Sequence, residues 1–136
     1  MKQSLIKTSR ALWKVFPMII GTILLVSLVN TLIPKSFYTI IFQKNIILDS
    51  LIGSVIGSIS LGNPIISYIF GGEFLSQGIS LIAVTAFLVA WVTVGVIQLP
   101  AEATILGKKF AFLRNITSFI FSIIVAIVTV LILNII

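Results

Sequence analysis

Carboxylates are scarce in this chain, and two of the three are candidates for chemistry. Asp49, Glu73 and Glu102 are its three acidic residues, in a sequence that is 59% hydrophobic and 9% charged. An ionised side chain inside a bilayer is costly unless it is hydrated, paired or protonated, so an acid there is a functional candidate by default. Glu73 is therefore predicted to bind a cation or relay a proton. The alternative places Glu73 at the outer mouth, solvated or paired with Lys35 or Lys44.

An asparagine followed by a proline marks a second candidate, a place to bind a polar solute. Asn63 offers a donor and an acceptor, and the backbone around Pro64 exposes carbonyl groups and the start of a helix. Broken helices of this kind bind solutes in transporters. Asparagine and proline are also common in tight turns, so a turn with no ligand is the alternative.

A third group of polar residues follows the next apolar run. Gln98 and Glu102 flank Pro100, which fits the first position of a helix and would place Glu102 in the first turn, near the positive end of the helix dipole. Helix capping alone would explain Glu102. The functional alternative is an acid at an inner gate, partnered by a basic residue among Lys108, Lys109 and Arg114.

Several classes of function are excluded by residue type. The chain has no cysteine and no histidine, so thiolate nucleophiles, imidazole bases and the usual zinc sites are absent. No phosphate-binding glycine loop, acid cluster with metal spacing or nucleophile beside a base is present. We therefore expect no catalytic site, no metal and no cofactor. The net charge of +6 comes from basic residues beside apolar segments, which indicates a lipid bilayer as the partner and no nucleic acid.

Three long apolar segments, residues 15–33, 79–99 and 116–133, are predicted to cross a membrane, since a crossing helix needs about 20 residues. Residues 49–78 lie between the first and second of these and are too few to cross twice. Unpaired backbone at membrane depth is tolerated only where protein or water surrounds it. The predicted fold is an all-α integral membrane protein, with three transmembrane helices plus a re-entrant, broken helical hairpin, in one domain over residues 1–136.

Within the broken stretch, residues that typically begin or end helices predict the internal structure. Asp49 is expected to cap a helix over residues 50–61, which the turn at Asn63 and Pro64 ends. A second short helix is expected from Ile65 to about Phe70. Two glycines, Gly71 and Gly72, would then loosen the path back to the surface.

The distribution of basic residues predicts the orientation. Four of them precede the first apolar segment and three precede the last one, which places both regions and the N-terminus in the cytoplasm. The chain is thus expected to be a multi-pass protein of the cytoplasmic membrane whose first segment is retained rather than cleaved. A single long helix over residues 37–61 would put the second basic group outside, so charge argues against it.

Small residues predict where helices pack closely. Gly53 and Gly57 are four residues apart with serines beside them, and Ser122 and Ala126 belong to a second small face. Small faces let helices approach in lipid, where apolar collapse does not drive association. We expect them to pack within the chain; a subunit interface is the alternative.

Residues 57–115 resemble the predicted permease family that includes the organoarsenical efflux permease ArsP. The resemblance lies in a GNP turn, a GGE element, the segment TAFLVAWVTVG and a turn running from QLPAE to LGKKF. It implies a polytopic permease whose full-length members are about twice this size and consist of two related halves. The residues in its motif positions are Asn63, Pro64, Gly71, Gly72, Glu73, Gln98, Pro100 and Glu102. The lack of cysteine argues against an arsenical cargo, because trivalent arsenicals favour thiolate ligands.

These observations predict a half-size membrane permease subunit that forms a small-solute or ion transport path as an oligomer, with a homodimer favoured. Asn63 would bind solute, Glu73 would supply charge or proton coupling, and Gln98 with Glu102 would form the cytoplasmic end of the path. The alternative is a non-transporting structural subunit that packs into a larger membrane complex.

Overall fold

The computed structural model describes residues 2–136, with side chains from Gln3 onward, and every regular element in that range is a helix. In chain order these are α1 (Lys2–Leu32), α2 (Lys35–Ile41), α3 (Ile46–Ile59), α4 (Pro64–Ser76), α5 (Leu81–Thr93), α6 (Leu99–Leu106) and α7 (Lys108–Ile135). The prediction of an all-α protein is confirmed. The chain divides into two compact units, the first ending at Pro34 and the second spanning Lys35–Ile136.

The first unit is one helix. α1 has 31 residues and passes through Pro17 without a break, so it contains nearly all of the predicted segment 15–33. Proline removes one backbone donor, a loss that membrane helices tolerate when neighbouring groups satisfy the freed carbonyl. Its hydrophobic side chains are largely exposed, among them Trp13, Phe16 and Leu24.

Two helices of the described chain, Gln3–Leu32 and Lys108–Ile135, are long and apolar enough to cross a membrane. A third crossing is counted if α2 and α3, which meet at 115°, form one bent span. The structure thus has two or three candidate spans by length and composition, as expected of a membrane protein. The straight helix over residues 37–61 does not form.

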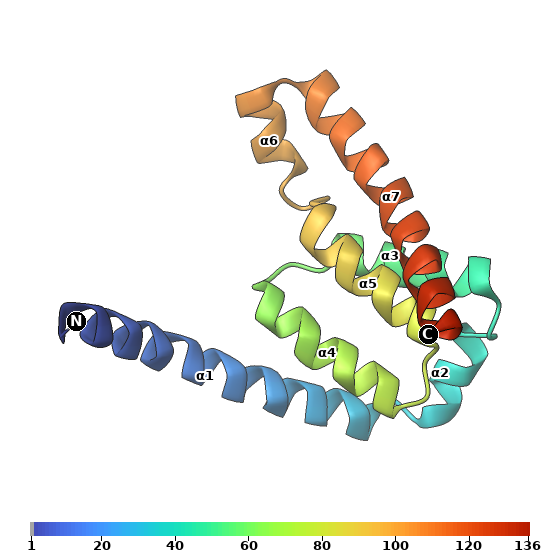
Figure 1. The fold of residues 1–136 in the computed structure, drawn as a ribbon, viewed down its shortest axis with the longest axis horizontal. Coiled ribbons are helices and arrows are strands. Elements are labelled where there is room, and N and C mark those ends of the chain that lie inside the picture. Colours follow the sequence, from blue (N-terminus) through green and yellow to red (C-terminus); the bar gives the residue numbers. More distant parts are fainter. Residues whose placement is uncertain (1) are drawn as a thin grey trace. The chain divides into compact units, whose positions relative to one another are not determined.

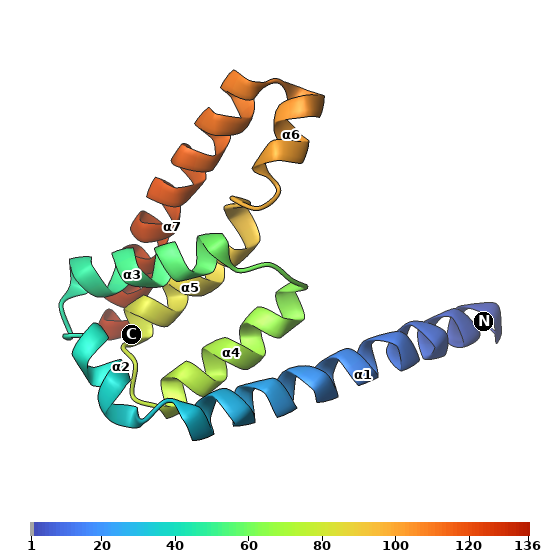
Figure 2. The same cartoon turned by 180° about the vertical axis from the view of Figure 1, so that it is seen from behind.

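The broken stretch folds as a pair of short antiparallel helices, α3 and α4, joined by residues 60–63 (Figure 2). Two predictions here are wrong in detail. The side chain of Asn45, rather than Asp49, caps α3 by accepting a hydrogen bond from the Ile47 amide at 3.2 Å. α4 also continues to Ser76 through both glycines. Gly71 fits its position because a Cβ atom there would lie 3.2 Å from Leu88, so the missing side chain serves packing rather than flexibility.

α5 is the central helix of the second unit and packs against α3, α4 and α7. Ala83, Ala86 and Ala90 on this helix are almost completely buried. α3 runs parallel to α5 and touches its backbone, because a Cβ atom on Gly53 would lie 2.1 Å from the Ala83 carbonyl oxygen. The predicted close packing of the small faces within the chain is therefore seen here.

The predicted segment 79–99 is not one continuous helix. α5 has only 13 residues, a rise of about 20 Å, which is less than the hydrocarbon thickness of about 30 Å. Val94 is extended, with φ −100° and ψ 119°, and α6 starts only at Leu99. The last helix is correspondingly longer than predicted: α7 begins at Lys108, so it takes in the segment 108–115 that was expected to lie outside the span.

Aromatic side chains form a continuous row along one side of α5. Tyr38 contacts Phe74, which contacts Phe87 with ring centroids 5.2 Å apart, and Phe87 contacts Trp91 at 5.3 Å. Phe70 joins the row through Phe74 and Trp91. The row links α2, α4 and α5, and it lies between two cavities at opposite ends of α5.

Candidate functional site

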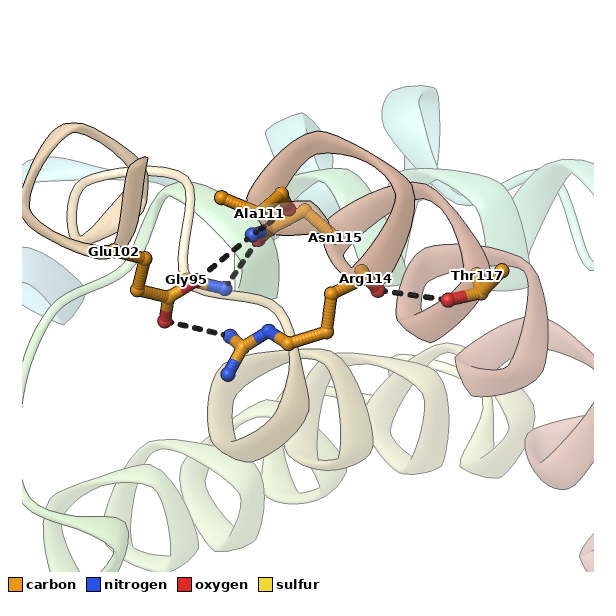
Figure 3. Close-up of polar contacts among 6 residues, drawn as sticks. All are labelled: Gly95, Glu102, Ala111, Arg114, Asn115 and Thr117. Atoms are coloured by element: carbon orange, nitrogen blue, oxygen red, sulfur yellow. Dashed lines mark hydrogen bonds and ion pairs between the residues drawn. The ribbon is translucent and has the colours of Figure 1, made fainter. Parts of the chain in front are cut away.

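The break between α5 and α6 is held by one side chain from α7. The amide of Gly95 donates to Oδ1 of Asn115 at 2.9 Å. Nδ2 of Asn115 donates to the Ala111 carbonyl at 3.0 Å and to Oε2 of Glu102 at 3.3 Å (Figure 3). Asn115 is 5% exposed. It therefore supplies a buried partner to backbone that the end of a helix leaves unpaired.

An ion pair lies beside this amide. Nη2 of Arg114 is 2.8 Å from Oε1 of Glu102, and the side chains are 38% and 16% exposed respectively. Glu102 thus uses one oxygen for Arg114 and the other for Asn115 (Figure 3). Nε of Arg114 is buried and makes no hydrogen bond within the described structure. The Arg114 guanidinium therefore still has a free N–H donor, whereas both oxygens of Glu102 already have a partner.

A cavity of about 250 Å³ opens at this end of α5. The Trp91 indole closes one side of it and donates from Nε1 to the Gly62 carbonyl at 3.3 Å. Its lining combines the α3–α4 turn, the α5–α6 break and the arginine: Ser60, Leu61, Gly62, Pro64, Trp91, Val92, Thr93, Val94, Gly95, Ile97, Gln98 and Arg114. Two stretches of irregular backbone therefore meet at one polar cavity.

Some of the predicted site residues meet at this cavity. Pro64 and Gln98 line it, and Glu102 reaches it through Arg114. Pro100 lies in the first turn of α6 together with Glu102, as the sequence predicted. Asn63 is the N-cap of α4, and its Oδ1 accepts from the Ile65 amide at 3.0 Å. That hydrogen bond is the one expected of a turn, and it leaves the Asn63 amide group as its remaining donor.

The other predicted residues lie farther along α4. Gly71 is buried against α5, and Gly72 has open space where a side chain would be. Glu73 accepts hydrogen bonds from Ser76 Oγ at 3.1 Å and Gln77 Nε2 at 2.9 Å. Glu73 is thereby linked to Gln77, which lines a different cavity, at the end of α5 opposite Gln98. The predicted set is thus divided between two sites.

Two residues with a prominent place in the structure were not predicted as site residues. Asn115 was placed just outside the last predicted span, in the cytoplasmic segment that precedes it, although amide side chains form hydrogen bonds between membrane helices. Asp49 was assigned to a helix cap, but it is completely buried and accepts from the Ser80 hydroxyl. Its spacing was informative, because Asp49, Gly53 and Gly57 repeat every four residues and so share one face of a helix.

Comparisons of this chain with protein families, with characterised proteins and with solved structures find no match.

Proposed function

We propose that this chain is a half-size membrane permease subunit that forms a small-solute or ion path as an oligomer. The observation that carries the proposal is the polar cavity at the α5–α6 break, which gathers irregular backbone, Gln98 and Arg114 in a chain where charge is rare. Non-helical backbone at membrane depth is stable where it lines a water-filled cavity, and transporters bind solutes at such breaks.

The chemistry of the cavity favours a polar solute with an acceptor group. Arg114 has a planar set of donors, only part of which Glu102 uses. A solute oxygen would compete with Glu102 for the guanidinium, and Asn115 would continue to hold the carboxylate when Arg114 turns away. In this proposal Glu102 and Arg114 form a gate, with Gln98 beside it and Asn63 at the neighbouring turn.

The proposed path needs a second copy. Within one chain, α3 and α5 are in backbone contact at Gly53 and Gly57, which leaves no passage between them. The aromatic row fills the other side of α5. A homodimer, in which two such units face one another, would supply the missing wall. The family resemblance in residues 57–115 supports the same arrangement, because it implies a permease of two related halves.

The proposed setting is the cytoplasmic membrane, with the N-terminus inside. α1 and α7 are long enough to cross, and the basic residues before each of them favour the inner side. The α3–α4 pair would then be the re-entrant hairpin, because each helix rises only about 20 Å.

The function is tested by combining single cysteines with flux, since the chain has no native thiol. Gln98→Cys and Asn63→Cys are expected to react with a polar thiol reagent in proteoliposomes. Modification at Gln98 should block the flux of tracer sodium, chloride or phosphate. Ser122→Cys is the matched control, because Ser122 is fully buried against Ser54 and should stay protected. Protection of both test positions, with liposomes tight to all three ions, would contradict the proposal.

Subunit mixing tests the dimer. If two copies share one path, adding a flux-blocked subunit should reduce flux with the square of the active fraction, whereas independent subunits give a linear decline. The alternative, a non-transporting structural subunit, is favoured by one observation: Asn63 and Glu73 both make hydrogen bonds within their own helix end. It predicts protected cysteines and a stable complex with other membrane proteins.

A further inference from the structure

A second cavity, of about 220 Å³, lies at the other end of α5 and contains the most deeply buried acid of the chain. Asp49 is 0% exposed. Its Oδ2 accepts from the Ser80 hydroxyl, while its Oδ1 has no hydrogen-bond partner among the described residues. A charged oxygen without a partner in a buried position costs several kcal/mol in real proteins. Such an atom requires either a ligand or a compensating group.

The Asp49 carboxylate lies near the starts of two helices. Asp49 lies in the first turn of α3, and Ser80 is the N-cap residue of α5, so the positive ends of two helix dipoles are close to it. The Ser80 hydroxyl adds a charge-assisted hydrogen bond. These contacts stabilise an anion but leave Oδ1 unused.

Apart from Lys44, the other polar side chains that line the cavity carry oxygen atoms. Its polar lining residues are Tyr38, Thr39, Gln43, Lys44, Asp49, Gln77 and Ser80. Gln77 donates its Nε2 to Glu73, which leaves its carbonyl oxygen as the remaining side-chain acceptor. The C-terminal end of α4, where carbonyls and the negative end of the dipole lie, also reaches the cavity through Gln77 and Gly78.

Two of the three acids lie at this end of α5. Asp49 lines the cavity, and Glu73 accepts a hydrogen bond from Gln77, which also lines it. Lys44 is the one basic residue in the lining, and no ion pair joins it to Asp49 in the described part of the chain. The third acid, Glu102, is paired with Arg114 at the opposite end.

We propose that this cavity binds a small, hard monovalent cation of the sodium class, with Oδ1 of Asp49 as its charged ligand. Hard cations take oxygen ligands, and protein sites for calcium combine about six to eight carboxylate, carbonyl and water oxygens. Asp49 is the one carboxylate in the lining, beside neutral oxygens and Lys44, which suits a single charge. Unwound backbone and the C-terminal ends of short helices coordinate coupling ions in transporters. A role of this cation as the coupling ion of a permease rests on the proposed function. The binding of the cation does not rest on it.

The test measures binding on the purified full chain in detergent, without flux. Sodium chloride replaces choline chloride at constant ionic strength, and the readouts are the thermal midpoint and the binding of tracer sodium. The wild-type protein should show a saturable rise of the midpoint and saturable sodium binding, both absent in Asp49→Asn. Ser80→Ala should weaken binding by roughly 10- to 100-fold, because it loosens the ligand's orientation. Ser122→Ala, which removes a buried serine hydroxyl that lines neither cavity, should bind sodium as the wild type does.

Each outcome decides the matter. Absence of a sodium effect in the wild type overturns the site, as does sodium binding that survives in Asp49→Asn. A midpoint that responds only to pH would identify a proton as the ligand and also overturn it. If Asp49→Asn does not fold, Ser80→Ala takes its place: a weakened affinity for sodium supports the site, and an unchanged affinity overturns it. Flux in liposomes is scored separately, so a permease without this site and a cation site without transport give different results.

Discussion

The contact between α3 and α5 makes a sharp prediction for Gly53. The substitution Gly53→Ala adds one Cβ atom, which would lie 2.1 Å from the Ala83 carbonyl oxygen and 2.9 Å from its carbonyl carbon. An ordinary contact begins at 3.4 Å, so the two backbones must separate by about 1.3 Å. The obstructing atoms belong to a helix backbone and cannot rotate away as a side chain would.

The magnitude follows from the same geometry. Overpacking of a close-packed core costs about 1 to 3 kcal/mol, and a backbone obstacle places this site in the upper part of that range. Gly72→Ala is the matched control, since it lies in the same bundle, within a helix, and meets nothing within 4 Å. Both substitutions gain about 1 kcal/mol of helix propensity. The difference between the two variants in free energy of unfolding should therefore be about 2 to 3 kcal/mol.

Unfolding in mixed micelles, followed by circular dichroism, measures this difference. Gly72→Ala should be at least as stable as the wild type, and Gly53→Ala clearly less stable. Equal stability of the two variants would refute the backbone contact between α3 and α5, and with it the argument that no solute passes between these helices.

Three further perturbations follow from individual contacts. Asn115→Ala leaves the Gly95 amide without its acceptor, so unfolding free energy should fall by about 1 to 3 kcal/mol, measured in the same micelles. A double-mutant cycle of Ser54→Ala and Ser122→Ala should give a coupling of about 0.6 kcal/mol, typical of hydrogen bonds between membrane helices; no coupling would contradict their 2.9 Å contact. Gly107→Ala should cost about 1 to 3 kcal/mol in the same micelles although it meets no atom within 4 Å, because φ +91° with ψ 144° is a backbone conformation that side-chain-bearing residues rarely adopt.

Apolar length predicted the helical class, the first and last candidate spans and the position of the broken stretch. It predicted α5 poorly, because an uncharged run of 21 residues was interpreted by hydrophobicity alone. The run contains three consecutive β-branched residues, Val92 to Val94, followed by Gly95, which favour extended backbone over helix. The end of α5 also depends on a partner for the Gly95 amide, and that partner is 20 residues away. No local pattern in the run itself reveals it.

The sequence predicted which kinds of residues lie at the breaks in the helices, but not which of these residues lie close together. Polar residues at broken backbone were recognised, and Glu102 was expected to meet a basic partner, which is Arg114. Asn63 and Glu73 each make hydrogen bonds at the end of their own helix, and for Asn63 this is the bond expected of the turn that was given as its alternative. Whether a polar side chain serves its own helix or a distant one depends on tertiary contacts, because the local alternative is always within reach.

The three acids differ in how their charge is compensated, and this difference separates structural from functional use. Glu102 contacts a guanidinium and an amide, and Glu73 contacts two side chains of the following turn. Asp49 is the most buried of the three, yet a single hydroxyl contacts it. If charge were placed only for stability, the deepest carboxylate would need the most partners. The reverse order indicates that Asp49 keeps an oxygen available for a ligand.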